Sequence, residues 1–406
     1  MGTRRLRVRA EGGTLGANLR YHPPMNLRWL APFAVVPLVA WAVARRTPQA
    51  TELPLLQIPV VVTLEGAPES GSTDVIVRGP GDGSRRAVFG RVVHEPGSAR
   101  HAVAWSNGVR RVVWVTVADA GANRHSTYNS ALHRVERGTS VRVLGGLTDA
   151  SSPLVTETGN VIVQRGRDGV EPDTSDGRRV LREQVDDLAL DALDPDTSQT
   201  RTIWSGRGQI AFLATALRGD ELAVYWVSER GAEVFGLDAR DGRTWPITGR
   251  IEPLARDFSY DRDRDEIVFA RAAHVGAADY EIVRVGAHSA AQTLRVVFRG
   301  ASDHLMPRVL RDGRVAFSPV GDSGLALLVS GGVDADRFAP LGEGTDAVLG
   351  ESSDGRWLAV RHQNRDREDM AIVQRASSAS VTISRADRLT EFVGFVDGSW
   401  ATGGQP

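Results

Sequence analysis

Short runs of alternating apolar and polar residues occur along most of the chain, and tight-turn signals separate them. Residues 308–317 and 351–360 show the pattern best, with Asp312-Gly313 and Asp354-Gly355 between two apolar segments. Asp-Gly and Asn-Gly accept the positive φ values of tight hairpins, so each run predicts one β-hairpin. Further turns are predicted at Asp397-Gly398, Asn107-Gly108, Gly159-Asn160, Gly219-Asp220 and 263–265.

The spacing of these turns predicts a repeat architecture. Successive turns lie roughly 42 to 60 residues apart, the range expected for propeller blades. A second hairpin follows within the period, most clearly at 234–248 and again at 190–204 and 131–144. Two hairpins per period give four strands per blade, and stacked blades bury the apolar face that a lone hairpin leaves exposed. The sequence therefore predicts an all-β fold, a β-propeller of four-stranded blades.

One repeat resembles a known family. Phe258-Ser259-Tyr260-Asp261, followed by Glu266-Ile267-Val268-Phe269, is similar to the inner hairpin of the TolB-type (WD40-like) propeller repeat of exported bacterial proteins. The resemblance covers roughly residues 100–402 and is specific for the fold, not for the function. It departs from the pattern at the turns near 159 and 264, and nothing matches the separate amino-terminal domain of TolB. It implies a non-catalytic propeller.

The number of blades depends on how the chain closes. The turns predict seven inner hairpins, and the last one lacks outer strands unless the β-rich segments 58–63 and 74–77 supply them. We favour seven blades with this clasp between the chain ends. Six blades with an irregular flanking segment are the alternative.

The amino-terminal segment predicts export. Residues 29–44 carry no charge, follow the short basic stretch 25–28 and end in Ala42-Val43-Ala44, a typical cleavage pattern. We therefore expect residues 1–44 to be a signal peptide and 45–406 to be the propeller domain, periplasmic or secreted. The alternative is an uncleaved anchor, in which residues 29–44 associate with the membrane, although a spanning helix needs roughly 20 residues.

The composition excludes several chemistries. The chain has no cysteine, and all 49 of its basic residues are arginine, so disulfides, thiolate nucleophiles and lysine Schiff bases are excluded. Residues 1–46 hold eight arginines and one glutamate, so the rest of a chain of net charge −1 is acidic. Binding of nucleic acid depends on cations against the phosphates, so we expect no nucleic-acid partner.

A carboxylate cluster is the candidate metal site. Asp261, Asp263 and Asp265 precede Glu266, but the segment lacks the glycine and the distal glutamate of a calcium loop. The interleaved Arg262 and Arg264 can neutralise the carboxylates, so we favour a structural turn over a metal. The nine histidines lack metal-binding spacing, and no cofactor is predicted.

Catalytic motifs are incomplete. Gly321-Asp322-Ser323-Gly324, with His101 upstream, resembles the nucleophile loop of trypsin-like proteases, but a triad needs geometry that a tetrapeptide does not specify. Residues 241–245 and 352–357 are near misses to the Asp-box of sialidase propellers, and no tyrosine has the setting of a glycosidase nucleophile. We therefore predict no catalytic residue.

Binding residues are harder to place. The tryptophans on predicted strands are explained by packing between blades, and partner anchors at the channel mouth are the alternative: Trp105, Trp114, Trp204, Trp226, Trp245, Trp357 and Trp400. The polar stretch 165–187 is either a binding loop or disordered. We expect a monomeric, extracytoplasmic, non-catalytic scaffold that binds a protein partner. The alternative is a secreted, glycosidase-like propeller hydrolase with a site at the channel mouth.

Overall fold

The computed structural model describes residues 58–401 with internal gaps. The gaps are 68–69, 85, 119–129, 148–152, 167–185, 209, 229, 252–254, 275–276, 278, 301–304, 319–324, 330–331, 334–340, 342, 365–367 and 385–388. Every described residue belongs to one compact unit, Pro54–Pro406. The predicted signal peptide or anchor at 1–44 lies outside the described residues. A search of the described part finds no helix long and apolar enough to cross a membrane.

The described residues form an all-β fold in which 28 strands make six sheets. The first sheet has the order β28 (Leu389–Phe395), β1 (Val61–Gly66), β2 (Ser72–Arg78), β3 (Arg86–Val93). An eight-stranded sheet contains β4 (Arg100–Ser106), β5 (Arg111–Ala118), β6 (Ser130–Glu136), β7 (Thr139–Leu147), β8 (Leu154–Val155), β9 (Val161–Gly166), β10 (Asp186–Leu193) and β11 (Thr200–Gly208).

Four further sheets have four strands each, paired in chain order. They are β12 (Ile210–Ala216), β13 (Glu221–Ser228), β14 (Gly231–Asp238), β15 (Thr244–Pro246); β16 (Arg256–Asp261), β17 (Glu266–Ala272), β18 (Tyr280–Gly286), β19 (Arg295–Gly300); β20 (Arg308–Val309), β21 (Val315–Phe317), β22 (Ala326–Val329), β23 (Gly332–Val333); and β24 (Thr345–Glu351), β25 (Trp357–Gln363), β26 (Glu368–Gln374), β27 (Ser380–Thr382). A short 3₁₀ helix, η1 (Gly398–Trp400), follows β28.

Middle strands are buried on both faces, whereas outer strands are not. Every residue of β1 is buried, and β18 buries all but its last residue. By contrast, β19 and β27 contain only exposed and half-buried residues. Each sheet packs between two neighbours, so its middle strands read as continuous apolar runs and only its outer strands meet water.

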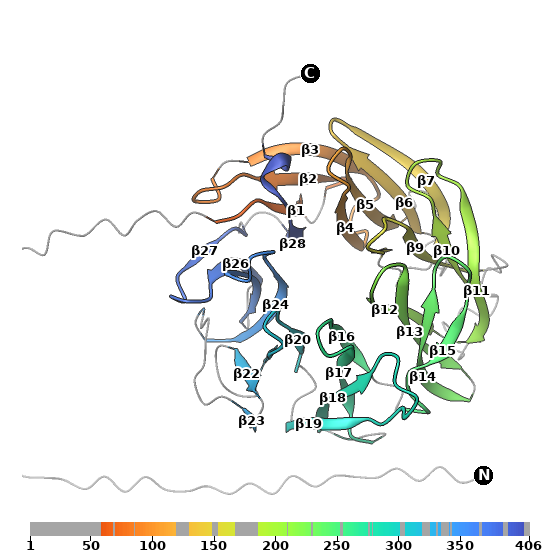
Figure 1. Ribbon diagram of the computed structural model, residues 1–406. Helices are drawn as coiled ribbons and strands as arrows, with labels where there is room; N and C mark the ends of the chain where they lie inside the picture. Colours follow the sequence, from red (N-terminus) through yellow and green to blue (C-terminus); the bar gives the residue numbers. More distant parts are fainter. Residues whose placement is uncertain are drawn as a thin grey trace, which may run out of the picture. The chain divides into compact units, whose positions relative to one another are not determined.

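Apolar clusters join successive sheets in a cycle (Figure 1). The junction between the last and first sheets brings Trp357 and Ile372 against Ile58 and Val61. A seventh cluster lies within the eight-stranded sheet, where Trp114 belongs to the same group as Val163. The β4–β7 and β9–β11 parts of that sheet share a single residue pair, Leu147 with Arg165.

The chain's first and last described strands meet in one sheet. β1 and β28 pair antiparallel, with Val61 opposite Phe395 and a register shift after Val62 (Figure 1). The Val396 amide donates to the Val60 carbonyl at 3.1 Å. We call this pairing the clasp. β28 lies between β1 and the centre of the cycle of sheets (Figure 1). The cycle therefore closes through the pairing of residues more than 300 positions apart.

Ionic contacts link the strands of the clasp to neighbouring strands. Arg78 Nη2 donates to Glu65 Oε1 at 2.7 Å and to the Ile383 carbonyl at 3.0 Å. The Glu65 side chain is fully buried, and Arg86 also donates to it at 2.7 Å. Arg100 donates to Glu391 Oε1 at 3.0 Å, which joins β4 to β28. Buried pairs of this kind add little net stability, but removing one partner strands the other charge.

The predicted turns at Asp312-Gly313 and Asp354-Gly355 lie between paired strands. They join β20 to β21 and β24 to β25. Gly355 has φ of 69°, in the left-handed region that glycine adopts without strain. Asp354 Oδ1 accepts from the Arg356 amide at 3.1 Å, which holds the turn. Side-chain bonds from Ser352 and Arg356 lower the pKa of Asp354 to about 2.

The prediction of a hairpin at Asp397-Gly398 is wrong. Asp397 is instead the N-cap of η1, and its Oδ1 accepts from the Ser399 amide at 2.8 Å. The short helix buries Trp400, whose ring centroid lies 5.2 Å from that of Phe89. An Asp-Gly pair suits a helix cap as well as a hairpin, and burial of the indole favours the helix here.

Candidate functional site

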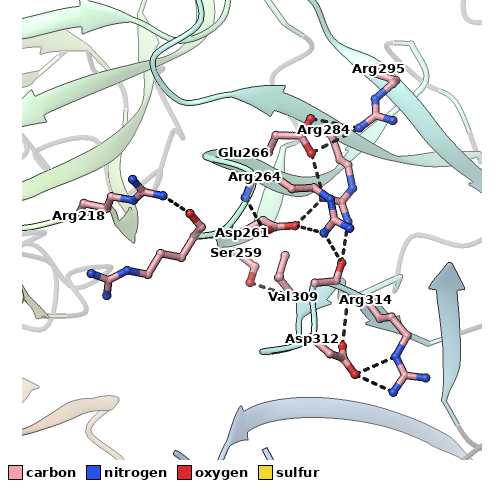
Figure 2. Close-up of polar contacts among 12 residues, drawn as sticks. Arg218, Ser259, Asp261, Arg264, Glu266, Arg284, Arg295, Val309, Asp312 and Arg314 are labelled. Atoms are coloured by element: carbon pink, nitrogen blue, oxygen red, sulfur yellow. Dashed lines mark hydrogen bonds and ion pairs between the residues drawn. The ribbon is translucent and has the colours of Figure 1, made fainter. Parts of the chain in front are cut away.

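The candidate metal ligands lie at the turn between β16 and β17. Asp261 is 1% exposed and ends β16. Its Oδ2 accepts from Arg264 Nη1 at 2.8 Å and from Arg284 Nη1 at 2.9 Å, as Figure 2 shows. Burial opposes ionisation, but the bonds from Arg284 and Arg264 outweigh it and hold the pKa of Asp261 below its ordinary value.

The same arginines connect two sheets. The Gly313 carbonyl, in the turn after β20, accepts from Arg264 at 3.0 Å and from Arg284 at 3.3 Å. Glu266 receives Arg284 at 3.0 Å and Arg295 at 3.1 Å (Figure 2). Every carboxylate of this network has a guanidinium partner, so it acts as a strut between neighbouring sheets.

The candidate ligand Asp265 has different partners from Asp261. Asp265, with φ of 54°, accepts from the Tyr260 hydroxyl at 2.7 Å and lies 2.8 Å from His288 Nδ1. Across the described residues, no group of three His, Cys, Asp or Glu side chains is arranged to hold a metal. The geometry is that of a turn, and it does not support Asp261, Asp263 and Asp265 as a metal site.

Catalytic alternatives meet similar obstacles. Burial, followed by the bond to Asp265, raises the pKa of Tyr260, so this phenol remains protonated near neutral pH and is a poor nucleophile. Burial also raises the pKa of Tyr225 to about 12. The 321–324 tetrapeptide lies outside the described residues, so its proximity to His101 stays untested. Of the predicted binding loop at 165–187, residues 167–185 also lie outside them, so that prediction stays untested too.

Three of the predicted strand tryptophans gather beside one another on β11, β13 and β15. The rings of Trp204 and Trp226 meet edge to face, with centroids 5.5 Å apart, and Phe235 contacts both. Trp245 stacks on His288 at 5.2 Å and donates from Nε1 to the Ala287 carbonyl at 2.8 Å. All three indoles are only partly buried. Packing between sheets therefore buries one part of each indole ring, and the other part is exposed to solvent.

Glycines make room for these rings. A Cβ on Gly206 would lie 2.5 Å from the Trp204 ring, and one on Gly236 would lie 2.5 Å from Trp245 Nε1. A Cβ on Gly208 would lie 2.6 Å from the Val227 carbonyl, beneath the Trp226 indole. Each indole thus lies so close to a strand glycine that a Cβ at that position would collide with it.

Three arginines border one of these tryptophans. A hollow of ≈ 540 Å³ is lined by Trp226 together with Arg207, Arg230 and Arg250. A second hollow of ≈ 270 Å³ lies next to it, because Trp226 lines both, and Trp204 and Trp245 complete its wall. The Trp–Arg surface is defined here as Trp204, Trp226, Trp245, Arg207, Arg230 and Arg250.

The sequence did not single out these three arginines. They come from β11, from the turn before β14 and from the segment after β15, so only folding brings them together. The one available signal is the run Trp204-Ser205-Gly206-Arg207-Gly208, where two glycines interrupt a strand beside a tryptophan.

Comparison with known proteins adds information on the fold. A scan against protein-family models and a search of curated protein sequences both found no match. Among solved structures, a puromycin-hydrolyzing peptidase of Mycobacterium tuberculosis is similar, with a TM-score of 0.54 and 15% identity over 82% of this chain. The chain spans about half of that peptidase, since the match covers 53% of it.

Two further structures are similar. An oligogalacturonate lyase of Vibrio parahaemolyticus has a TM-score of 0.50 and 8% identity over 77% of this chain and 90% of its own. TolB of Acinetobacter baumannii has a TM-score of 0.44 and 12% identity over 83% of each chain, which carries no argument for a TolB-type assignment. Identities this low speak for the fold alone. Together with the cyclic sheets, they show that the chain has an all-β fold of the β-propeller type.

Proposed function

We propose that this chain is a non-catalytic, seven-bladed propeller that binds a protein partner outside the cytoplasm. Dividing the eight-stranded sheet at the Leu147–Arg165 pair yields seven four-stranded units, and seven apolar clusters then match seven junctions. The TolB-type repeat and the uncharged segment 29–44 support an exported binding protein.

The observation that carries the proposal is the Trp–Arg surface. Tryptophan and arginine are the residues most enriched at the energetic centres of protein interfaces. Here Trp226 lines one hollow with three exposed arginines and lines a second hollow with the partly exposed Trp204 and Trp245. The arginines of the Asp261 network, in contrast, are occupied by carboxylates within the fold. We assign partner binding to the first set and structural support to the second.

Photo-crosslinking in cells producing the full chain tests this function. A photoreactive amino acid replaces Thr244, an exposed residue of β15 at the edge of the Trp–Arg surface. Thr382 is the matched control, because β27 has the same burial pattern as β15 and belongs to another sheet. We expect one protein to be crosslinked through Thr244 and not through Thr382, and the purified partner to bind the purified chain.

Two results would contradict the proposal. Equal crosslinking at both positions, or none at Thr244, would mean that this surface binds no protein. Turnover of glycosides or peptides by the purified chain would favour the hydrolase alternative instead.

A further inference from the structure

We propose that the ≈ 540 Å³ hollow of the Trp–Arg surface binds acidic side chains of an extended segment of the partner protein. The inference rests on the proposed function and specifies the chemistry of the partner. Volumes of about 300–1,000 Å³ are typical of pockets that hold a specific ligand, so the hollow can take several side chains.

The lining of the hollow has an unbalanced charge. Arg207, Arg230 and Arg250 are all exposed, and their guanidinium groups make no ion pair within the described part of the chain. Among the described residues of the lining, Glu233 is the one acidic residue, so three positive charges face one negative charge there. In the whole chain the two signs balance, with 49 basic and 50 acidic residues. The hollow therefore concentrates positive charge that the fold itself does not use.

The guanidinium groups of the lining are suited to bind carboxylates. Arginine presents a planar fork of donors that matches a carboxylate, and charge-assisted pairs of this kind are stronger than neutral hydrogen bonds. Trp226 forms an apolar wall beside the three forks. This combination suits a ligand that alternates carboxylates with apolar groups, as acidic polypeptides do.

The position of the hollow beside an edge strand favours a polypeptide over an acidic polysaccharide. Arg207 belongs to β11, which is the edge strand of its sheet. An extended peptide can pair its backbone with an edge strand while its side chains enter adjacent pockets, and a polysaccharide lacks the backbone amides for such pairing. The edge strand and the arginines therefore suit the same kind of ligand.

Fluorescence anisotropy with a labelled octaglutamate peptide tests the inference on the full chain. We expect saturable binding that weakens as ionic strength rises. Arg230→Gln and Arg250→Gln should each weaken binding roughly tenfold, and the triple change with Arg207→Gln should abolish it. Arg230→Lys should keep part of the affinity that Arg230→Gln loses, because lysine carries the same charge without the planar guanidinium group.

Arg91→Gln is the matched control. Arg91 lies on β3 with a side chain that is 61% exposed and pairs with Asp74 at 2.6 Å, so this variant loses one positive charge away from the hollow. It should bind octaglutamate as the unmodified chain does. Thermal unfolding should show that all variants remain folded, since each changes an exposed side chain.

Three results would overturn the inference. They are absence of octaglutamate binding, equal loss of affinity in Arg91→Gln and the pocket variants, and tighter arginine-dependent binding of polygalacturonate than of octaglutamate. Crosslinking through Thr244 separates the two proposals. If it persists while octaglutamate fails to bind, the partner function stands and the acidic segment is wrong. If octaglutamate binds and no protein is crosslinked, the preference of the hollow for acidic side chains stands and the partner function is wrong.

Discussion

Replacing Trp400 by alanine should strongly destabilise the fold, because this residue fastens the carboxyl-terminal end of the clasp. Its side chain is 6% exposed and packs in the cluster that joins the first two sheets. Removing a buried tryptophan costs about 3–5 kcal/mol, through lost burial and the cavity left behind. A domain is stable by only about 5–15 kcal/mol, so the loss is a large share of the total.

The contact with Phe89 accounts for part of this cost. The two ring centroids lie 5.2 Å apart with the planes tilted by 33°. A double-mutant cycle with Phe89→Ala should show a coupling of about 0.5–1.5 kcal/mol. Trp400 Nε1 is buried without a hydrogen-bond partner in the described residues, so Trp400→Phe should cost much less than Trp400→Ala.

Urea unfolding followed by circular dichroism measures these free energies. Val109→Ala is the control, because Val109 is 86% exposed and such changes usually fall within about 0.5 kcal/mol. A urea midpoint for Trp400→Ala equal to that of Val109→Ala would show that burial of Trp400 does not stabilise the fold. It would mean that η1 contributes nothing to closure and that β28 holds the clasp without it.

Three further predictions concern the turns and the amino terminus. Gly355→Val places a β-branched residue at φ of 69° and should destabilise by about 1–3 kcal/mol in urea unfolding; an unchanged midpoint would exclude a rigid turn there. The folded-state pKa of Asp354 is about 2, below its ordinary 3.8, so its stabilisation is complete above the ordinary value and lost as pH falls through 2. Asp354→Asn should therefore lower the free energy of unfolding by no more than about 1 kcal/mol at neutral pH, because Asp354 and its partner Arg356 are largely exposed. At pH below about 2 the substitution should cost nothing, and a difference that does not depend on pH would contradict this. Mass spectrometry of the exported protein should find an amino terminus near Arg45, and recovery of a peptide containing Trp29 from membranes would favour the anchor instead.

The carboxylate cluster shows why spacing alone could not decide between metal and turn. The sequence places Asp261, Asp263 and Asp265 two residues apart, which fits either a metal loop or a turn. Arg264, which belongs to the local pattern, donates to Asp261. The second partner, Arg284, lies 23 residues from Asp261 and reaches it only because β17 and β18 pair, so the local pattern contained one of the two neutralising groups.

Local sequence determined the strands and most hairpins, because alternation and Asp-Gly turns act over a few residues. Asp312-Gly313 and Asp354-Gly355 lie in turns between paired strands for that reason. Asp397-Gly398 does not, because the burial of Trp400 against Phe89 involves residues that are far apart in the chain. A dipeptide that permits two conformations takes the one that tertiary contacts stabilise.

The all-β chain of repeated hairpins follows from the amino-acid sequence, since hydrogen bonding and side-chain alternation in a hairpin are local. The Trp–Arg surface, in contrast, forms only when the sheets pack against one another. Arg207, Arg230 and Arg250 lie on separate elements with no shared motif, and the sheets bring them beside Trp226. A surface of this kind depends on long-range packing, whose geometry no short stretch of sequence encodes.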